Sequence, residues 1–197
     1  GLRALGGGYT DIAWTHLLDR ESGRYNVPFL PKYLPDMKVV LVHLFRREIG
    51  LVTAPGNPLG IAGIEDIAGK RVRFVNRQEG SGTRVLLDDR LKSAGIPAWE
   101  ISGYDREVCT HVEVGLSILA GEADAGLATV AVSRLMGLHF IPVTREDFDM
   151  ALGQSTYFHR GIQALMDILR SPGLRGRFEK LGGYGFEDSG KILYSNI

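Results

Sequence analysis

Residues 75–84, VNRQEGSGTR, have the residue types of an anion-binding turn. An apolar strand is predicted before the turn and a helix directly after it. The first turn of a helix has N–H groups without partners and a partial positive charge. Two glycines let the backbone approach a ligand, two hydroxyls add donors and two arginines add charge, so the turn suits a phosphate-like oxyanion. The alternative is an ordinary glycine-rich turn in which Ser81 or Thr83 only caps the helix. The candidate contacts are Arg77, Gly80, Ser81, Gly82, Thr83 and Arg84.

A second helix start follows at Thr110-His111. Thr110 and Glu113 have the spacing of a capping box, which places another set of N–H groups at this point. The alternative is a helix cap without a ligand. Residues 121–129, GEADAGLAT, are predicted to form a turn and a buried strand.

Patterns typical of catalysis or metal binding are missing from the sequence. The glycine-rich turn lacks the G-x-x-x-x-G-K-[ST] spacing of a P-loop, and Ser81 does not stand in a G-x-S-x-G elbow. The five histidines show no metal-ligand spacing. Cys109 is the single cysteine, so it has no C-x-x-C partner and no internal disulfide. We therefore expect no metal, no cofactor and no intrinsic enzyme activity.

The composition is that of a folded globular domain. The chain has 197 residues, a formal net charge of zero and 44% hydrophobic residues, which excludes a disordered segment. It has no basic excess, so we expect no direct contact with nucleic acid. No apolar run approaches the roughly 18 residues of a membrane helix, and no signal peptide is visible. These observations are compatible with a location in the cytoplasm or in the periplasm.

The hydrophobic pattern alternates between strands and helices in the middle of the chain. This alternation predicts an α/β fold with a largely parallel sheet. Within the 110–120 helix, Val112, Leu116 and Leu119 share one face. Strands are predicted at 11–18, at 38–53 as two strands broken near Arg46–Glu48, and at 71–76, 124–128 and 139–143. Helices are predicted at 61–68, 81–94, 110–120, 129–136, 162–169 and after Ser171-Pro172.

Taken together, these segments resemble the periplasmic-binding-protein-like domain of molybdate- or tungstate-related proteins. In that family the domain is appended to helix-turn-helix regulators or to molybdopterin biosynthesis proteins. The resemblance spans nearly the whole chain, and VNRQEGSGTR is its strongest piece. The matching stretches are residues 11–30, 39–61, 74–88, 101–114, 121–131 and the LGGY of 181–184.

The resemblance implies a two-lobed, hinged type II fold that holds its ligand between the lobes and closes on binding. Lobe 1 would comprise residues 1–54 and 147–197, and lobe 2 residues 55–146. The hinge strands would pass through 51–54 and 148–152. Carried over by position, the anion contacts would be Ser81, Gly82, Thr83, Thr110, His111 and Thr129.

One departure from the family concerns the start of the chain. Family members begin with a further strand and helix, which supply the anion donors of lobe 1. Here the sequence opens at Gly1, so we expect that strand and helix to be missing from it. His16 and Tyr25 are the candidate lobe 1 contacts in their place.

The resemblance implies a molybdate- or tungstate-binding sensor or effector domain. It would be fused to another domain in a cytoplasmic regulator or molybdenum-cofactor biosynthesis protein. The alternative is the periplasmic binding component of an oxyanion ABC transporter. An enzyme of similar architecture, such as hydroxymethylbilane synthase, is disfavoured because Cys109 is the only candidate to carry a cofactor. A site made only of donors favours fully deprotonated molybdate or tungstate over phosphate, provided that Glu79 points to solvent.

Overall fold

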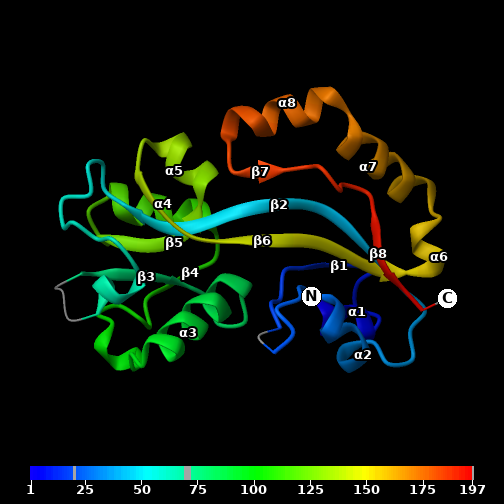
Figure 1. Ribbon diagram of the computed structural model, residues 1–197, viewed down its shortest axis with the longest axis horizontal. Coiled ribbons are helices and arrows are strands. Elements are labelled where there is room, and N and C mark those ends of the chain that lie inside the picture. The colour runs from blue at the N-terminus through cyan, green and yellow to red at the C-terminus, as the bar shows by residue number, and fades with distance from the viewer. Residues whose placement is uncertain (20, 69–71, 197) are drawn as a thin grey trace. The chain divides into compact units, whose positions relative to one another are not determined.

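The computed structural model describes residues 1–19, 21–68 and 72–196. The chain divides into two compact units (Figure 1). Unit 1 contains Gly1–Arg47, Glu146–Lys180 and Tyr184–Ile197, and unit 2 contains Glu48–Arg145 and Leu181–Gly183. Two long strands, β2 (Val39–Thr53) and β6 (His139–Gly153), each contribute residues to both units. None of the helices in the described ranges is both long and apolar enough to cross a membrane.

Unit 1 is a sheet with helices on both faces. β1 (Ile12–Thr15) pairs antiparallel with β6, and β2 follows β6 in the strand order. Two short strands near the C-terminus, β7 (Tyr184–Gly185) and β8 (Ile192–Ser195), also pair with β2. Val39 and Leu41 of β2 pack with helices α1 (Leu2–Gly6) and α2 (Leu30–Tyr33). Val40 and Val42 pack with α7 (Arg160–Arg170). The remaining helices are η1 (Val27–Phe29), α6 (Gln154–Tyr157) and α8 (Pro172–Leu181).

Unit 2 has the strand order β2-β5-β3-β4. β5 (Ala125–Thr129) pairs antiparallel with β2, whereas β3 (Phe74–Arg77) is parallel to both β5 and β4 (Glu107–Val108). The helices are α3 (Gly82–Ala94), α4 (His111–Leu119) and α5 (Val130–Met136). Two single 3-10 turns, η2 (Ile64–Ile67) and η3 (Ala98–Glu100), lie in the connections.

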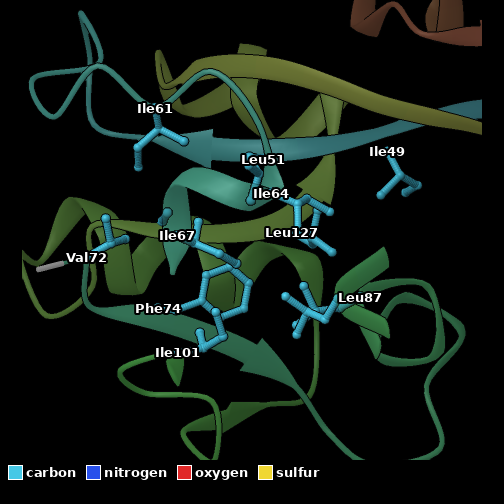
Figure 2. Close-up of a cluster of buried hydrophobic side chains, with 12 residues drawn as sticks. Ile49, Leu51, Ile61, Ile64, Ile67, Val72, Phe74, Leu87, Ile101 and Leu127 are labelled. Atoms are coloured by element: carbon cyan, nitrogen blue, oxygen red, sulfur yellow. The ribbon is translucent and has the colours of Figure 1, made fainter. Parts of the chain in front are cut away.

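The helices of unit 2 lie on opposite faces of its sheet. Successive residues of a strand point to opposite faces, and the two hydrophobic clusters of unit 2 alternate in this way. The first cluster (Figure 2) contains Leu51, Phe74 and Leu127 of the strands with Leu87 of α3. The second contains Val52, Val75 and Ala128 with Val114 of α4 and Val132 of α5. Helix α3 therefore covers one face, and α4 and α5 cover the other.

The predicted break near Arg46–Glu48 is wrong, because β2 is one strand of 15 residues. Its charged stretch continues the ladder, with Arg46 opposite Gly185 and Arg47 opposite Tyr184. β6 supplies the opposite charge for each side chain, which lets a charged run stay extended. The ion pairs are Arg46–Asp147 (3.0 Å), Arg47–Glu146 (2.5 Å) and Glu48–Arg145 (2.7 Å).

Three further sequence expectations need correction. The sheet is mixed rather than largely parallel: β3 runs parallel to β4 and β5, whereas β1 is antiparallel to β6, and β5, β7 and β8 are antiparallel to β2. The 61–68 helix is only the 3-10 turn η2, and residue 71 of the predicted 71–76 strand lies outside the described residues. The face of α4 formed by Val112, Leu116 and Leu119 is exposed, because the helix buries Val114, Gly115 and Ile118 instead.

Gly183 occupies a position with no room for a side chain. Its φ is +72°, and an added Cβ would lie 1.8 Å from Cγ1 of Val130. We expect Gly183→Ala to lower the free energy of unfolding by about 2–4 kcal/mol, because a left-handed conformation and overpacking both carry a cost. Urea denaturation followed by circular dichroism measures the change.

Gly176→Ala is the matched control. Gly176 lies inside α8, and its added Cβ would meet nothing within 4 Å. The free energy of unfolding of this variant should rise by about 0.5–1 kcal/mol, because alanine has a better helix propensity than glycine. If Gly183→Ala were as stable as the control, the tight contact with Val130 would be refuted.

Candidate functional site

The carboxyl ends of three neighbouring strands define one edge of the unit 2 sheet. β5, β3 and β4 are mutually parallel, and each is followed within a few residues by a helix. The helix after β3 covers one face, whereas the helices after β4 and β5 cover the other. Ligands of open α/β sheets bind outside the carboxyl ends of strands at such a divergence of helices. This edge is therefore the candidate site in unit 2.

Ser81 is the N-cap of α3. Its Oγ accepts a hydrogen bond from the N–H of Arg84 at 3.2 Å, and Gly80 before it has a φ of +80°. Thr83 is not the cap and is only 2% exposed. Because capping uses the hydroxyl oxygen as an acceptor, the O–H proton of Ser81 can still be donated.

Thr110 caps α4 with the predicted capping box, which is confirmed. The Oγ1 of Thr110 accepts from the N–H of Glu113 at 3.1 Å. The carboxylate of Glu113 accepts from the N–H groups of Thr110 (2.7 Å) and Cys109 (2.6 Å). Glu113 is thereby fixed on the backbone of its own helix.

Arg77 links the end of β3 to the start of α4. Its guanidinium donates to the carbonyl oxygen of Cys109 at 2.7 Å and lies 3.2 Å from Nδ1 of His111. An arginine can only donate, so Nδ1 of His111 accepts and the ring proton belongs to Nε2. The arrangement places a full positive charge beside the partial positive charge of a helix N-terminus. A bound anion would stabilise both charges.

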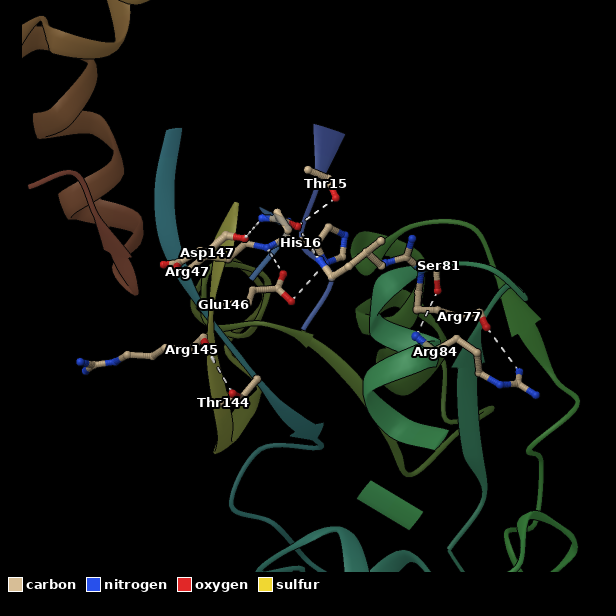
Figure 3. A network of polar contacts seen from close by, with 12 residues as sticks. Thr15, His16, Arg47, Arg77, Ser81, Arg84, Thr144, Arg145, Glu146 and Asp147 are labelled. Carbon is tan, nitrogen blue, oxygen red and sulfur yellow. Dashed lines mark hydrogen bonds and ion pairs between the residues drawn. The ribbon is translucent and has the colours of Figure 1, made fainter. Parts of the chain in front are cut away.

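The side chain of Arg84 is engaged in ion pairs within unit 2. Only 8% exposed, it contacts Asp88 (3.3 Å) and Glu107 (3.0 Å), and its guanidinium lies 3.9 Å from the ring centre of Tyr104. Two carboxylates neutralise its charge. Through Glu107 the side chain of Arg84 therefore fixes α3 against β4. Figure 3 shows the hydrogen bond between Arg84 and the cap Ser81.

Thr129 lies at the same edge of the sheet as the two caps. It ends β5 and caps α5, accepting from the N–H of Val132 at 3.4 Å. Its side chain is buried, with 5% exposure. Unit 2 thus brings Arg77, Ser81, Thr110, His111 and Thr129 to the carboxyl ends of three adjacent strands.

The other two predicted contacts, His16 and Tyr25, belong to unit 1. Nδ1 of His16 lies 3.2 Å from Oε2 of Glu146 (Figure 3). The ring of His16 also stacks on that of Phe148. Tyr25 forms an isolated bridge with Leu18. Burial works to raise the pKa of Glu146, but hydrogen bonding to His16 and the charge of Arg47 lower it overall.

Sequence reasoning missed a buried polar network in unit 1. The side chain of Asn26 accepts from Oγ1 of Thr15 (2.9 Å) and donates to Oδ2 of Asp149 (2.6 Å). Oδ1 of Asp149 lies 2.8 Å from Nδ1 of His43. All four residues are at most 3% exposed. Asn26 also has a φ of +57°, a conformation that asparagine tolerates better than most residues. Positions 26, 43 and 149 are too far apart in sequence for any local signal.

Within the described ranges, no three His, Cys, Asp or Glu residues are grouped as a metal site would require.

Comparison with known proteins gives consistent matches. The PBP superfamily domain matches residues 1–170. The protein YvgK of Bacillus subtilis (strain 168) is 31% identical over 186 residues, which are 94% of this chain and 60% of YvgK. The chain thus spans about 60% of the length of this relative.

Solved structures share the fold at low identity. A protein named for L-cystine ABC transport in Listeria monocytogenes has a TM-score of 0.59 and 18% identity, covering 96% of this chain and 76% of its own. The regulatory domain of Synechocystis PCC6803 CcmR, solved in complex with 2-PG, has a TM-score of 0.58 and 12% identity. That match covers 84% of this chain and 74% of the CcmR domain. At these identities the likeness concerns the fold alone.

Proposed function

The chain belongs to the PBP superfamily, and from this membership and the site in unit 2 we propose that it binds a small oxyanion. The ligand we propose is molybdate or tungstate. The domain would act as the sensor or effector part of a larger cytoplasmic regulator or molybdenum-cofactor biosynthesis protein. The greater length of YvgK is compatible with a further domain in such a protein.

The observation that carries the proposal is the charge at the start of α4. Arg77 stands at this helix N-terminus, and the neighbouring helix α3 begins with a serine cap between glycines. The nearby carboxylates are not directed to an anion. Glu113 is bound to backbone N–H groups, Glu107 pairs with Arg84, and Glu79 is exposed. The edge of the sheet therefore offers donors and positive charge.

This donor set favours an anion without a proton. Molybdate and tungstate are fully deprotonated at pH 7, whereas every phosphate ion carries one or two protons at that pH. A proton buried without an acceptor costs about 1–3 kcal/mol, which corresponds to about tenfold or more in affinity. We therefore propose that the protein prefers molybdate or tungstate to phosphate.

Two alternatives use the same donors. A periplasmic transport component would bind the same oxyanion in another compartment. An organic ligand such as an amino acid would present its carboxylate to the two helix starts, in line with the cystine-related name of one structural neighbour. An amino acid also needs a partner for its ammonium group. The titration that separates these ligands therefore includes L-cystine beside the oxyanions.

Ser81→Ala is expected to weaken molybdate binding several-fold to about tenfold while the fold persists, because one hydroxyl donor to a charged acceptor is lost. Isothermal titration at pH 7 measures the affinity. Ser81→Gly is the informative second variant, since glycine replaces serine at an N-cap with little loss of stability. It should weaken binding as much as alanine does.

Ser93→Ala provides the control on the same helix. The hydroxyl of Ser93 donates to the carbonyl oxygen of Asp89 near the C-terminal end of α3. Its removal should leave the affinity for molybdate unchanged. Wild-type affinity in Ser81→Gly would refute the role of the Ser81 hydroxyl.

A further inference from the structure

A hollow of unit 2 lies between α5 and the beginning of β6. Its volume is about 700 Å³, within the range of small-molecule pockets. Val130 and Arg134 of α5 line one side, Phe140 and Val143 of β6 line the other, and Glu48 and Arg145 complete it. None of the residues assigned above to the oxyanion lines this hollow.

The turn that joins the two walls is fixed by hydrogen bonds. Helix α5 ends at Gly137, which has the left-handed φ of +64°. The buried hydroxyl of Ser133 donates to the carbonyl oxygen of Leu138 at 2.8 Å, and the N–H of Leu138 donates back to the carbonyl of Ser133 at 2.9 Å. The divergence of α5 and β6 is therefore part of the fold, and the hollow is preformed.

Among the described residues that line the hollow, the charges of Glu48, Arg134 and Arg145 sum to one positive charge. Glu48 pairs with Arg145 at 2.7 Å, so these two charges offset each other. Arg134 is exposed, and its NH1 makes one long contact of 3.5 Å with the carbonyl oxygen of Leu181. A guanidinium has five N–H donors in a planar fork that matches a carboxylate. Arg134 can therefore bind an anionic group at the mouth of the hollow.

The remaining wall is apolar. Val130, Phe140, Pro142 and Val143 present hydrocarbon surface next to Arg134. A small inorganic oxyanion would leave this surface in contact with water, whereas an organic anion would cover it. We propose that this hollow is a second binding site of the protein, and that it takes an apolar carboxylate whose charged end pairs with Arg134.

The test uses 2-naphthoate as the probe and the whole chain as the protein. Titration followed by ¹H–¹⁵N NMR should show saturable shifts for the amides of Arg134, Leu138, His139 and Thr144, with those of Ser81 and His111 unmoved. Acetate, which has the carboxylate without the apolar body, should bind at least about tenfold more weakly, since an apolar body of this size contributes more than 1.4 kcal/mol.

Arg134→Gln should weaken 2-naphthoate binding about tenfold or more, because charge-assisted hydrogen bonds are lost. The matched control is Arg90→Gln, which removes an exposed arginine from the middle of α3 and changes the net charge equally. The proposal is overturned if Arg134→Gln binds the probe as tightly as wild type. It is equally overturned if Arg90→Gln weakens binding as much, or if the shifts lie outside Glu48 and residues 130–145. The molybdate titration is independent of all these outcomes.

Discussion

Replacing Asp149 with alanine is expected to lower the free energy of unfolding of unit 1 by about 3–5 kcal/mol. Asp149 is fully buried and joins Asn26, from the loop after β1, to His43 of β2. Without its carboxylate, Nδ1 of His43 loses this partner, and Nδ2 of Asn26 keeps only the longer contact of 3.4 Å with the carbonyl oxygen of Asp147. Each unsatisfied buried group costs about 1–3 kcal/mol.

The two tryptophans make this effect measurable in one unit at a time. Trp14 lies in β1 of unit 1, opposite Met150, and Trp99 lies in unit 2. In a Trp99→Phe background, urea denaturation followed by Trp14 fluorescence reports on unit 1. Since Trp99 is 82% exposed, its replacement should disturb little.

Asp147→Ala is the matched control two residues along the same strand. Asp147 pairs with the half-exposed Arg46 at 3.0 Å, and surface pairs of this kind contribute about 0–1 kcal/mol. If Asp149→Ala lowered the free energy of unfolding no more than Asp147→Ala does, the buried network would not stabilise unit 1 as proposed.

Arg77→Gln is expected to weaken molybdate binding by about 10- to 100-fold, because each hydrogen bond to a charged group contributes about 1.5–3 kcal/mol. In the anion-free protein the substitution should change stability little, since the lost guanidinium contacts are partly offset by relief of its repulsion from the start of α4. The effect of Arg77→Gln should therefore appear as a smaller increase in the free energy of unfolding when molybdate is added. Molybdate at 100 times its dissociation constant should stabilise the wild type by about 2.7 kcal/mol.

Arg73→Gln controls for the loss of one positive charge. Arg73 directly precedes β3 and pairs with Asp124, so it lies at the opposite end of the strand from Arg77. The Arg73→Gln variant should bind molybdate with the same affinity as the wild type. If the two variants were equally affected, the charge of the whole unit rather than the position of Arg77 would explain binding.

The parts of the site that depend on local chemistry could be read from the sequence. The caps of α3 and α4 are set by residues within four positions of one another, as in Thr110 and Glu113. The relation between Arg77 and His111 was not visible, because 34 positions separate them and only the parallel pairing of β3 and β4 brings them together.

The wrong or missed sequence predictions also depend on contacts between residues that are far apart in the sequence. Arg46–Glu48 resembled a break because their partners on β6 lie about 100 positions away. The apolar stripe of Val112, Leu116 and Leu119 resembled a core face because α4 is apolar on two sides, and periodicity alone does not say which side meets the sheet. β7 and β8 were missed because they are short and owe their pairing to β2.

The proposed function requires that the edge of the unit 2 sheet between the caps of α3 and α4 binds a small oxyanion without a proton. Its most direct test is isothermal titration of the protein at pH 7 with molybdate, phosphate and L-cystine in a chloride buffer of constant ionic strength. We expect saturable binding of molybdate, at least about tenfold weaker binding of phosphate, and molybdate binding that is about 10- to 100-fold weaker in Arg77→Gln. Binding of phosphate as tight as that of molybdate, or of L-cystine in place of both, would contradict the proposed function.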